Sequence, residues 1–247
     1  GLSVALLWGE NTLLYGGLVS ADSYSLFFKI FFFALGGVII FISNDYVKRY
    51  LHSPGEFYAI IIFAILAMVV MAESVELLTA YIALELMSFC FYILVAYARA
   101  NRKSNEAGVK YVLIGAFSSA ILLYGISLLY GAVGETRFSG IERELASAMA
   151  NADSQSPTLW IGLALILVGL GFKVAAVPFH MWAPDTYEGA PLPVTAFLSV
   201  GSKAAAFALL IRLFGHAFLP TIDQWQILIA ILAALTMTIG NVVAIAQ

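Results

Sequence analysis

The feature that most constrains this chain is a series of long apolar runs. A membrane-spanning helix needs about 20 predominantly apolar residues. Runs that meet or approach this length are residues 25–43, 57–72, 75–98, 108–132, 158–181, 191–214 and 225–247, and residues 1–7 resemble the end of an earlier run. Lipid offers no partner to a free backbone group, and the runs lack the alternation of a barrel, so the spans are expected to be helices. The sequence predicts an all-α integral membrane protein, a polytopic helix bundle forming one transmembrane domain over 1–247.

Composition supports the membrane class. Hydrophobic residues make up 62% of the 247 residues and charged residues 11%, whereas a soluble domain has about 45–50% and about 25%. The net charge of −3 gives no reason to expect a nucleic-acid partner. The single cysteine, Cys90, lies in an apolar run without metal-ligand spacing. It is expected to be a small buried hydrophobe, and no metal site is predicted.

The distribution of basic residues between the runs predicts an orientation. Lys48, Arg49, Arg99, Arg102 and Lys103 lie in one set of loops, and the opposite set has fewer basic residues and several acidic ones. Cytoplasmic loops carry an excess of lysine and arginine. The loops 44–56, 99–107 and 182–190 are therefore expected to face the cytoplasm.

Ionisable residues inside the apolar runs are the candidate functional residues. They are Glu85, Lys110, Lys173, Lys203 and Lys29. A charge at the centre of a membrane span costs about 2.5–3.5 kcal/mol even on lenient insertion scales. An intramembrane charge is therefore first interpreted as functional.

Glu85 belongs to a polar stripe. Tyr81, Glu85, Ser88 and Tyr92 are spaced by four, three and four residues, which places them on one helix face. The alternative is a structural hydrogen-bonded seam between helices. The higher cost of burying a carboxylate favours a functional role for Glu85.

Lys173 lies one turn before Pro178, in a run that Pro157 is expected to begin. Proline lacks an N–H group and breaks a helix, and a broken helix at membrane depth is tolerated only where protein or water satisfies the backbone. Lys173 is therefore expected to line a polar cavity, the alternative being a lysine that reaches the interface. His180 follows the break and is expected either to titrate near neutrality or to bond the freed carbonyls.

Lys203 is central in its run, four residues after Ser199 and eight after Thr195. This spacing predicts another polar stripe on one helix face. Lys29 has no comparable polar neighbours along its run, and a functional and a structural role are equally open for it.

Lys110 lies nearer the start of its run, where Ser104 or Asn105 is expected to cap the helix. A lysine at this depth can reach the interface, so a functional and a structural role are both open for Lys110. Asp185 and Glu188 lie in the proline-rich connection 178–193, where they either collect protons at the membrane surface or are solvated loop charges.

Buried lysines and a carboxylate suit proton movement. Burial favours the neutral form of a lysine, and a nearby carboxylate favours its charged form. A carboxylate that approaches or leaves a lysine therefore switches it between holding and releasing a proton. A chain of such groups, joined by hydroxyls and water, permits a transmembrane proton relay.

Several motifs closely resemble a known family. They are Ala-Leu-Glu85-Leu-Met-Ser, Ser-Asn-Glu-Ala-Gly-Val-Lys110-Tyr, Val-Gly-Leu-Gly-Phe-Lys173-Val-Ala-Ala-Val-Pro178-Phe-His180-Met-Trp-Ala-Pro-Asp185-Thr-Tyr-Glu-Gly-Ala-Pro, and Phe-Leu-Ser-Val-Gly-Ser-Lys203-Ala-Ala-Ala-Phe. They resemble the antiporter-like subunit N family of bacterial respiratory complex I, the proton-pumping NADH:quinone oxidoreductase. The resemblance covers nearly the whole chain.

The resemblance implies an antiporter-like fold of inverted five-helix repeats, of which this chain holds the first repeat and the start of the second. It implies that Glu85 and Lys173 form the family's ion pair and that Lys110, Lys203 and His180 extend the relay. The family's exit-side lysine has no counterpart here, so the chain is expected to be part of a longer protein.

The resemblance also implies partners and a location. Neighbouring antiporter-like and other membrane-arm subunits of complex I are the expected partners, in the bacterial plasma membrane. FMN, iron–sulfur clusters and quinone are expected in partner subunits, with no cofactor on this chain. The alternatives are a subunit of a multisubunit cation/proton antiporter or membrane-bound hydrogenase, and a purely structural membrane scaffold.

Overall fold

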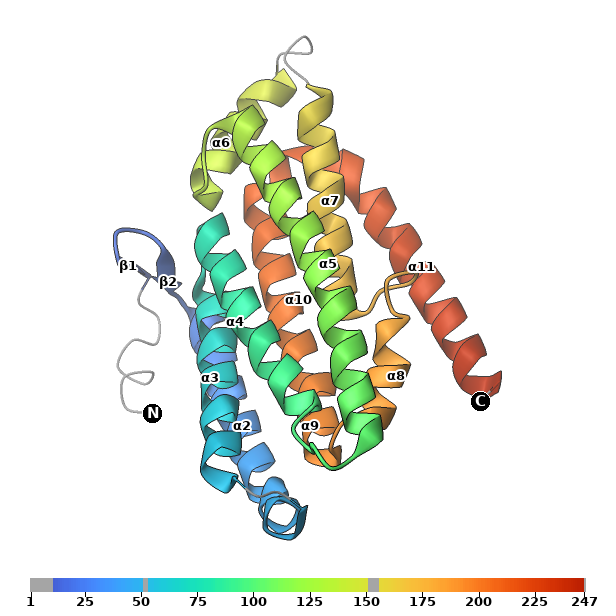
Figure 1. Cartoon of the computed structure of the whole chain (residues 1–247). Helices are drawn as coiled ribbons and strands as arrows, with labels where there is room; N and C mark the ends of the chain where they lie inside the picture. Colours follow the sequence, from blue (N-terminus) through green and yellow to red (C-terminus); the bar gives the residue numbers. More distant parts are fainter. Residues whose placement is uncertain (1–10, 51–52, 151–155, 247) are drawn as a thin grey trace.

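The computed structural model describes residues 11–50, 53–150 and 156–246, and consists mainly of helices (Figure 1). A short antiparallel hairpin precedes them, in which Leu13 pairs with Ser20. The hairpin strands are β1 (Thr12–Leu14) and β2 (Val19–Ala21). The helices are α2 (Ser23–Tyr50), α3 (Pro54–Glu73), α4 (Leu77–Val95), α5 (Arg102–Val133), α6 (Phe138–Ala150), α7 (Pro157–Val174), α8 (Trp182–Gly189), α9 (Leu192–Phe197), η2 (Leu198–Ser202), α10 (Lys203–Arg212), η3 (Leu213–Ala217), η4 (Leu219–Thr221) and α11 (Ile222–Ala246).

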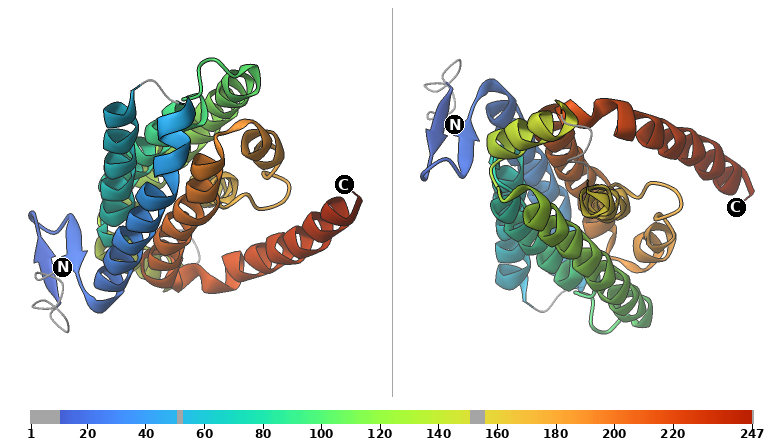
Figure 2. Two further views of the ribbon diagram at one scale, coloured as in Figure 1. Left: turned by 90° about the horizontal axis from the view of Figure 1, so that it is seen from below. Right: turned by 90° about the horizontal axis from the view of Figure 1, so that it is seen from above.

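The long helices form a bundle, and α11 lies apart from it. Helix α5 packs along α7 and α3 packs along α4, while α2 and α10 both contact α3. The continuous helix formed by α9, η2, α10 and η3 runs beside α2, α3 and α4, and Figure 2 shows α11 projecting away from the other helices. The buried apolar side chains therefore lie between α2–α5, α7 and α10.

Seven helices of the described part are long and apolar enough to cross a membrane. They are α2, α3, α4, α5, α7, the continuous helix Leu192–Ala217 and the helix Leu219–Val243. They overlap the seven runs expected from the sequence. The expected partial span at residues 1–7 lies outside the described residues.

Close packing of α5 on α7 depends on glycines. A Cβ added at Gly125 would lie 2.9 Å from both the carbonyl oxygen of Gly162 and the backbone nitrogen of Ile166. A Cβ at Gly169 would lie 2.6 Å from the Cβ of Leu122. The absence of a side chain at Gly125 and Gly169 therefore lets α5 approach α7 closely.

Helix α7 ends earlier than the sequence predicted. The expected run extended to residue 181, but α7 stops at Val174, and Ala175 adopts a left-handed conformation with φ of 58°. The residue before a proline is disfavoured in helical conformation, and proline itself has no N–H to donate. The break therefore lies before Pro178 rather than at it.

Helix α5 begins earlier than predicted. The run was expected from residue 108 with Ser104 or Asn105 as cap, but the cap is Asn101, whose side chain accepts a hydrogen bond from the N–H of Lys103. Ser104 instead donates to the carbonyl of Val95 at 2.6 Å. Arg102 and Lys103 therefore lie in the first turn of the helix.

Strands β1 and β2 and helix α6 were not expected from the sequence. Helix α6 lies between the expected runs 108–132 and 158–181 and buries Phe138, Ile141 and Leu145, whose spacing of three and four residues places them on one face. Strand β2 contacts the rest of the chain at Ser74, through a bridge to Val19. Helix α6 lies at the end of the bundle opposite to the α4–α5 connection, and the hairpin projects to the side of the bundle (Figure 1).

Glycine at position 125 is expected to be necessary for stability. Gly125→Ala would force the backbones of α5 and α7 apart, and overpacking of this kind costs about 1–3 kcal/mol. The midpoint of thermal unfolding of the detergent-purified protein should fall. Gly131→Ala is the matched control, because Gly131 lies on the same helix and a Cβ added there would meet open space. This variant should not lower the midpoint. An equal fall for both variants would contradict the packing argument.

Candidate functional site in the bundle interior

The interior site is built around Lys173, whose side chain is 2% exposed. Its ammonium group donates a hydrogen bond of 2.7 Å to the Ser88 hydroxyl on α4. The same ammonium lies 5.6 Å from the centre of the Phe172 ring, within the range of a cation–π interaction. Lys173 is therefore held inside the protein and does not reach toward the interface.

Glu85 lies on the same face of α4 as Ser88, one turn away. One of its carboxylate oxygens accepts a hydrogen bond of 2.6 Å from the Ser119 hydroxyl on α5. Within the described part of the chain no direct ion pair joins Glu85 to Lys173. The expected ion pair is therefore an indirect arrangement, in which Ser88 binds the lysine and Ser119 binds the carboxylate.

Tyr92 extends this group of hydroxyls along α4. Its hydroxyl is buried and has no hydrogen-bond partner among the described residues. A Cβ added at Gly115 on α5 would lie 2.2 Å from the hydroxyl oxygen, so only glycine leaves room for it. Three of the four residues of the predicted polar stripe thus face the α4–α5 and α4–α7 contacts.

The broken end of α7 places Lys173 in the last turn of the helix. At the other end, α7 begins at Pro157, as the sequence predicted, and Ser156 caps the helix by accepting from the N–H of Leu159. Beyond the break, His180 is half-buried, and its Nδ1 atom has no partner among the described residues. His180 therefore does not bond the freed carbonyls through this nitrogen.

Lys203 is the first residue of α10 and directly follows a π-helical turn, η2. The hydroxyl of Thr195 donates to the carbonyl of Tyr187, and that of Ser199 to the carbonyl of Ala196. These hydroxyls therefore bond backbone and not Lys203. The half-buried lysine places its ammonium 5.3 Å from the centre of the Tyr187 ring on α8.

Lys110 is not buried. It forms ion pairs with Asp185 on α8 at 2.7 Å and with Glu106 at 3.0 Å, and its side chain is 45% exposed. A second pair joins Lys103 to Glu188 at 2.8 Å. These residues line a surface cavity of about 220 Å³ between α5 and α8. Asp185 and Glu188, which were expected in a connecting loop, therefore lie on helix α8 and pair with lysines of α5.

Lys29 has a partner that the sequence did not indicate. Its ammonium forms an ion pair with the Glu73 carboxylate at the end of α3, and both side chains are largely buried. Glu73 lies in the gap between the expected runs 57–72 and 75–98. A charge between two runs does not indicate a function, because it is expected to be solvated. The pair lies toward the end of the bundle opposite to Lys110, because Lys29 is near the start of α2 and Glu73 ends α3.

Arg212 forms the other strong ion pair at this end. It bonds both carboxylate oxygens of Asp22, at 2.8 and 2.9 Å, and is 5% exposed. Burial raises the pKa of Asp22, but hydrogen bonds from Arg212 and Ser25 outweigh this effect and lower the pKa to about 2. Sequence reasoning missed Asp22, although a charge inside the apolar run 191–214 could have drawn attention to Arg212.

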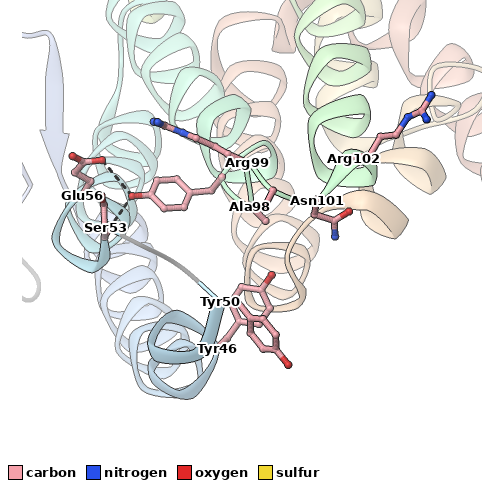
Figure 3. Close-up of a pocket in the computed structure, with 10 residues that line it drawn as sticks. Tyr46, Tyr50, Ser53, Glu56, Ala98, Arg99, Asn101 and Arg102 are labelled. Carbon is pink, nitrogen blue, oxygen red and sulfur yellow. Dashed lines mark hydrogen bonds between the residues drawn. The ribbon is translucent and has the colours of Figure 1, made fainter.

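A separate pocket of about 480 Å³ lies where α2 ends and α4 connects to α5. Tyr97 donates to the carbonyl of Ser53 at 2.8 Å there. Figure 3 shows that the side chains of Arg99 and Arg102 point away from each other. This pocket has no converging charges and does not include any of the interior residues.

The fold and the interior site define a multi-pass membrane protein with ionisable groups inside its helix bundle. The model of the family "NADH:quinone oxidoreductase/Mrp antiporter, TM" matches residues 74–247. This chain belongs to that family.

Curated relatives agree with this assignment. The chain is 47% identical over 240 residues to NADH-quinone oxidoreductase subunit N of Desulforamulus reducens, covering 97% of this chain and 49% of the relative. It is 49% identical over 235 residues to subunit N of Moorella thermoacetica, covering 95% and 48%. The chain therefore spans about half the length of these relatives.

Solved structures share the fold. Respiratory complex I from Thermus thermophilus has a chain with a TM-score of 0.78 and 34% identity, which covers all of this chain and 50% of its own length. The Mrp complex from Dietzia sp. has a chain with a TM-score of 0.64 and 20% identity, covering 81% of this chain and 36% of its own. The predicted antiporter-like helix bundle with a broken helix is thus confirmed as the fold class.

The Asp22–Arg212 pair is expected to contribute to stability. Asp22→Ala leaves a buried arginine without its partner, and breaking such a pair costs about 3–5 kcal/mol. The midpoint of thermal unfolding should fall clearly, whereas Glu188→Ala, which breaks an exposed pair, should cost at most about 1 kcal/mol. Equal effects of the two variants would contradict this prediction.

The contribution of Asp22 also has a defined pH dependence. Because its pKa is lowered to about 2 in the folded protein, its stabilising effect is complete above the usual aspartate pKa of about 4. It is lost as the pH falls through about 2. The unfolding midpoints of wild type and Asp22→Ala should therefore converge over this window.

Proposed function

We propose that the protein containing this chain is a proton-translocating membrane subunit of an NADH:quinone oxidoreductase. The main support is the buried lysine Lys173, bonded to Ser88 beside the Glu85–Ser119 pair, in a chain that is 43–49% identical to relatives named subunit N. A buried ammonium that served only as packing would be replaced at lower cost by an apolar side chain.

The geometry supports a proton relay between α4, α5 and α7. Ser88 and Ser119 each hold one of the two ionisable groups, and a hydroxyl can accept one proton while donating another. When Glu85 moves closer to Lys173, the charged lysine is favoured, and when it moves away, release of the proton is favoured.

The surface cavity between α5 and α8 suits the entry side of this relay. Lys110, Asp185 and Glu188 line it, and exposed carboxylates at a membrane surface can exchange protons with water. Lys203, the first residue of α10, has its ammonium over the Tyr187 ring of α8 and is the next ionisable group of the proposed relay after Lys173. His180, half-buried beyond the helix break, is a further member.

The redox chemistry is assigned to partner subunits. Electron transfer from NADH through FMN and iron–sulfur clusters to quinone would take place there, and the neighbouring antiporter-like subunits of the membrane arm would transmit the driving force. The assembled complex would lie in the bacterial plasma membrane.

The alternative is a subunit of a cation/proton antiporter or another membrane-bound complex. The Mrp complex and the archaeal membrane-bound sulfane sulfur reductase have chains of similar fold, at 20% and 22% identity. The higher identity to relatives named subunit N favours the first proposal. Purification of the native complex distinguishes them, since only an NADH:quinone oxidoreductase would carry NADH-reducible flavin and reduce quinone.

Removal of the central lysine is expected to abolish pumping. In the assembled complex, Lys173→Ala should lower NADH-driven proton uptake by at least about a hundredfold, since a positioned proton-transfer group contributes roughly 10²–10⁴-fold. Proton uptake is measured in proteoliposomes and compared with the rate of quinone reduction. Lys48→Ala, an exposed lysine in the last turn of α2, is the control, and normal pumping by an assembled Lys173→Ala complex would disprove the relay.

The two adjacent serines of α5 provide a matched pair. Ser119→Ala removes the donor to Glu85, and a hydrogen bond to a charged group contributes about 1.5–3 kcal/mol. We expect proton uptake to slow by about tenfold or more. Ser118→Ala removes only a 3.5 Å contact with the carbonyl of Gly169, and its proton uptake should stay within about twofold of wild type. Similar rates for both variants would exclude a role for Ser119.

A further inference from the structure

Trp182, the first residue of α8, lies against the broken end of α7. Its side chain is 3% exposed, and its indole N–H donates a hydrogen bond of 3.0 Å to the carbonyl of Phe172. In an intact helix this carbonyl would accept from the N–H of Ala176, which here bonds the carbonyl of Gly171. At the break it accepts from the N–H of Ala175 at 3.0 Å instead, and the indole adds a second hydrogen bond to it, at the residue directly before Lys173.

The indole ring is held by aromatic side chains of three helices. It stacks on Tyr111 of α5, with ring centres 4.8 Å apart and an interplanar angle of 18°. The Phe172 ring of α7 lies at 5.2 Å, and the Tyr187 ring of α8 at 6.0 Å. Trp182 thus has one orientation, fixed from several sides.

Two of these three rings, Phe172 and Tyr187, also contact the interior lysines. The ammonium of Lys173 lies over the Phe172 ring, and that of Lys203 over the Tyr187 ring, at 5.6 and 5.3 Å. A shift of the indole would therefore disturb both lysine environments, although Trp182 itself touches neither ammonium group.

Helix α8 itself is fixed on α5. The pairs Lys110–Asp185 and Lys103–Glu188 join the two helices. A Cβ added at Gly189 would lie 2.6 Å from the carbonyl oxygen of Lys103, so the end of α8 approaches the α5 backbone closely. The indole is consequently carried by a helix whose position is set by exposed ion pairs and close packing with α5.

We propose that Trp182 is a positioning residue, which holds the broken end of α7 and the two aromatic rings so that Lys173 and Lys203 keep their places in the proton path. This inference rests on the proposed function, because it assigns Trp182 an effect on proton transfer. A purely structural tryptophan would affect only folding and assembly.

The test removes the N–H group and keeps the shape of the side chain. In the full-length protein within its assembled complex, Trp182 is replaced by 3-benzothienylalanine, in which sulfur takes the place of the indole N–H. NADH-driven proton uptake should fall about threefold to tenfold, as expected for the loss of one hydrogen bond, with normal assembly. Replacement of Trp182 by 5-fluorotryptophan, which keeps the N–H, should leave proton uptake at the wild-type rate.

Trp225 provides the matched control. Its indole donates to the carbonyl of Phe218 at 2.8 Å, also at a junction between helical segments, and its ring packs on Phe214, whereas Lys173 and Lys203 lie over the Phe172 and Tyr187 rings. The same sulfur analogue at position 225 should leave proton uptake within about twofold of wild type. An equal loss at both positions, or an equal loss with 5-fluorotryptophan at position 182, would overturn the positioning role.

Lys173→Ala is measured in parallel to separate the two proposals. If Lys173→Ala stops proton uptake while the sulfur analogue at position 182 pumps normally, the role of Trp182 is wrong and the relay stands. If Lys173→Ala pumps normally, the relay is wrong, whatever the result at position 182.

Discussion

The burial of the Lys173 ammonium is the constraint on which the rest of the interior depends. A charge at membrane depth requires polar partners, and these come from three helices that must be held at fixed distances. Ser88 on α4 binds the lysine, Ser119 on α5 binds Glu85, and the broken end of α7 carries Lys173 itself. The close packing of α5 on α7, which requires Gly125 and Gly169, keeps these partners within hydrogen-bonding distance.

The charges of the bundle are arranged in three layers along its length. At one end, Lys110 and Asp185 form an exposed pair that water can reach. In the interior, Glu85 and Lys173 are kept apart and are each bonded to a neutral hydroxyl. At the other end, Lys29 with Glu73 and Arg212 with Asp22 form direct pairs. Direct pairing fixes the protonation of a group, whereas neutral partners leave it free to change. The middle layer is therefore the one to which the proposed proton transfer is assigned.

Much of the fold could be predicted from the sequence, because length and hydropathy decide whether a segment can span a membrane. The helix boundaries were harder to predict from the sequence. Asn101 caps α5 although Ser104 and Asn105 carry an equally good capping side chain, and the end of α7 depends on the conformation of Ala175. Helix α6 was missed because its apolar face of Phe138, Ile141 and Leu145 is too short to stand out among longer runs.

The sequence by itself determined that this chain is a membrane-embedded helix bundle with Glu85, Lys173 and Lys203 inside it, since an apolar run fixes the depth of every residue in it. Only the tertiary structure decided the partners of these residues and of Lys29. Ser119 and Glu73 carry no distinctive local pattern, and their contacts span 34 and 44 residues of sequence. Helix packing also placed Lys110 at the surface and Trp182 against the break. Contacts between distant helices depend on how side chains of both fit together, which periodicity within one helix does not encode.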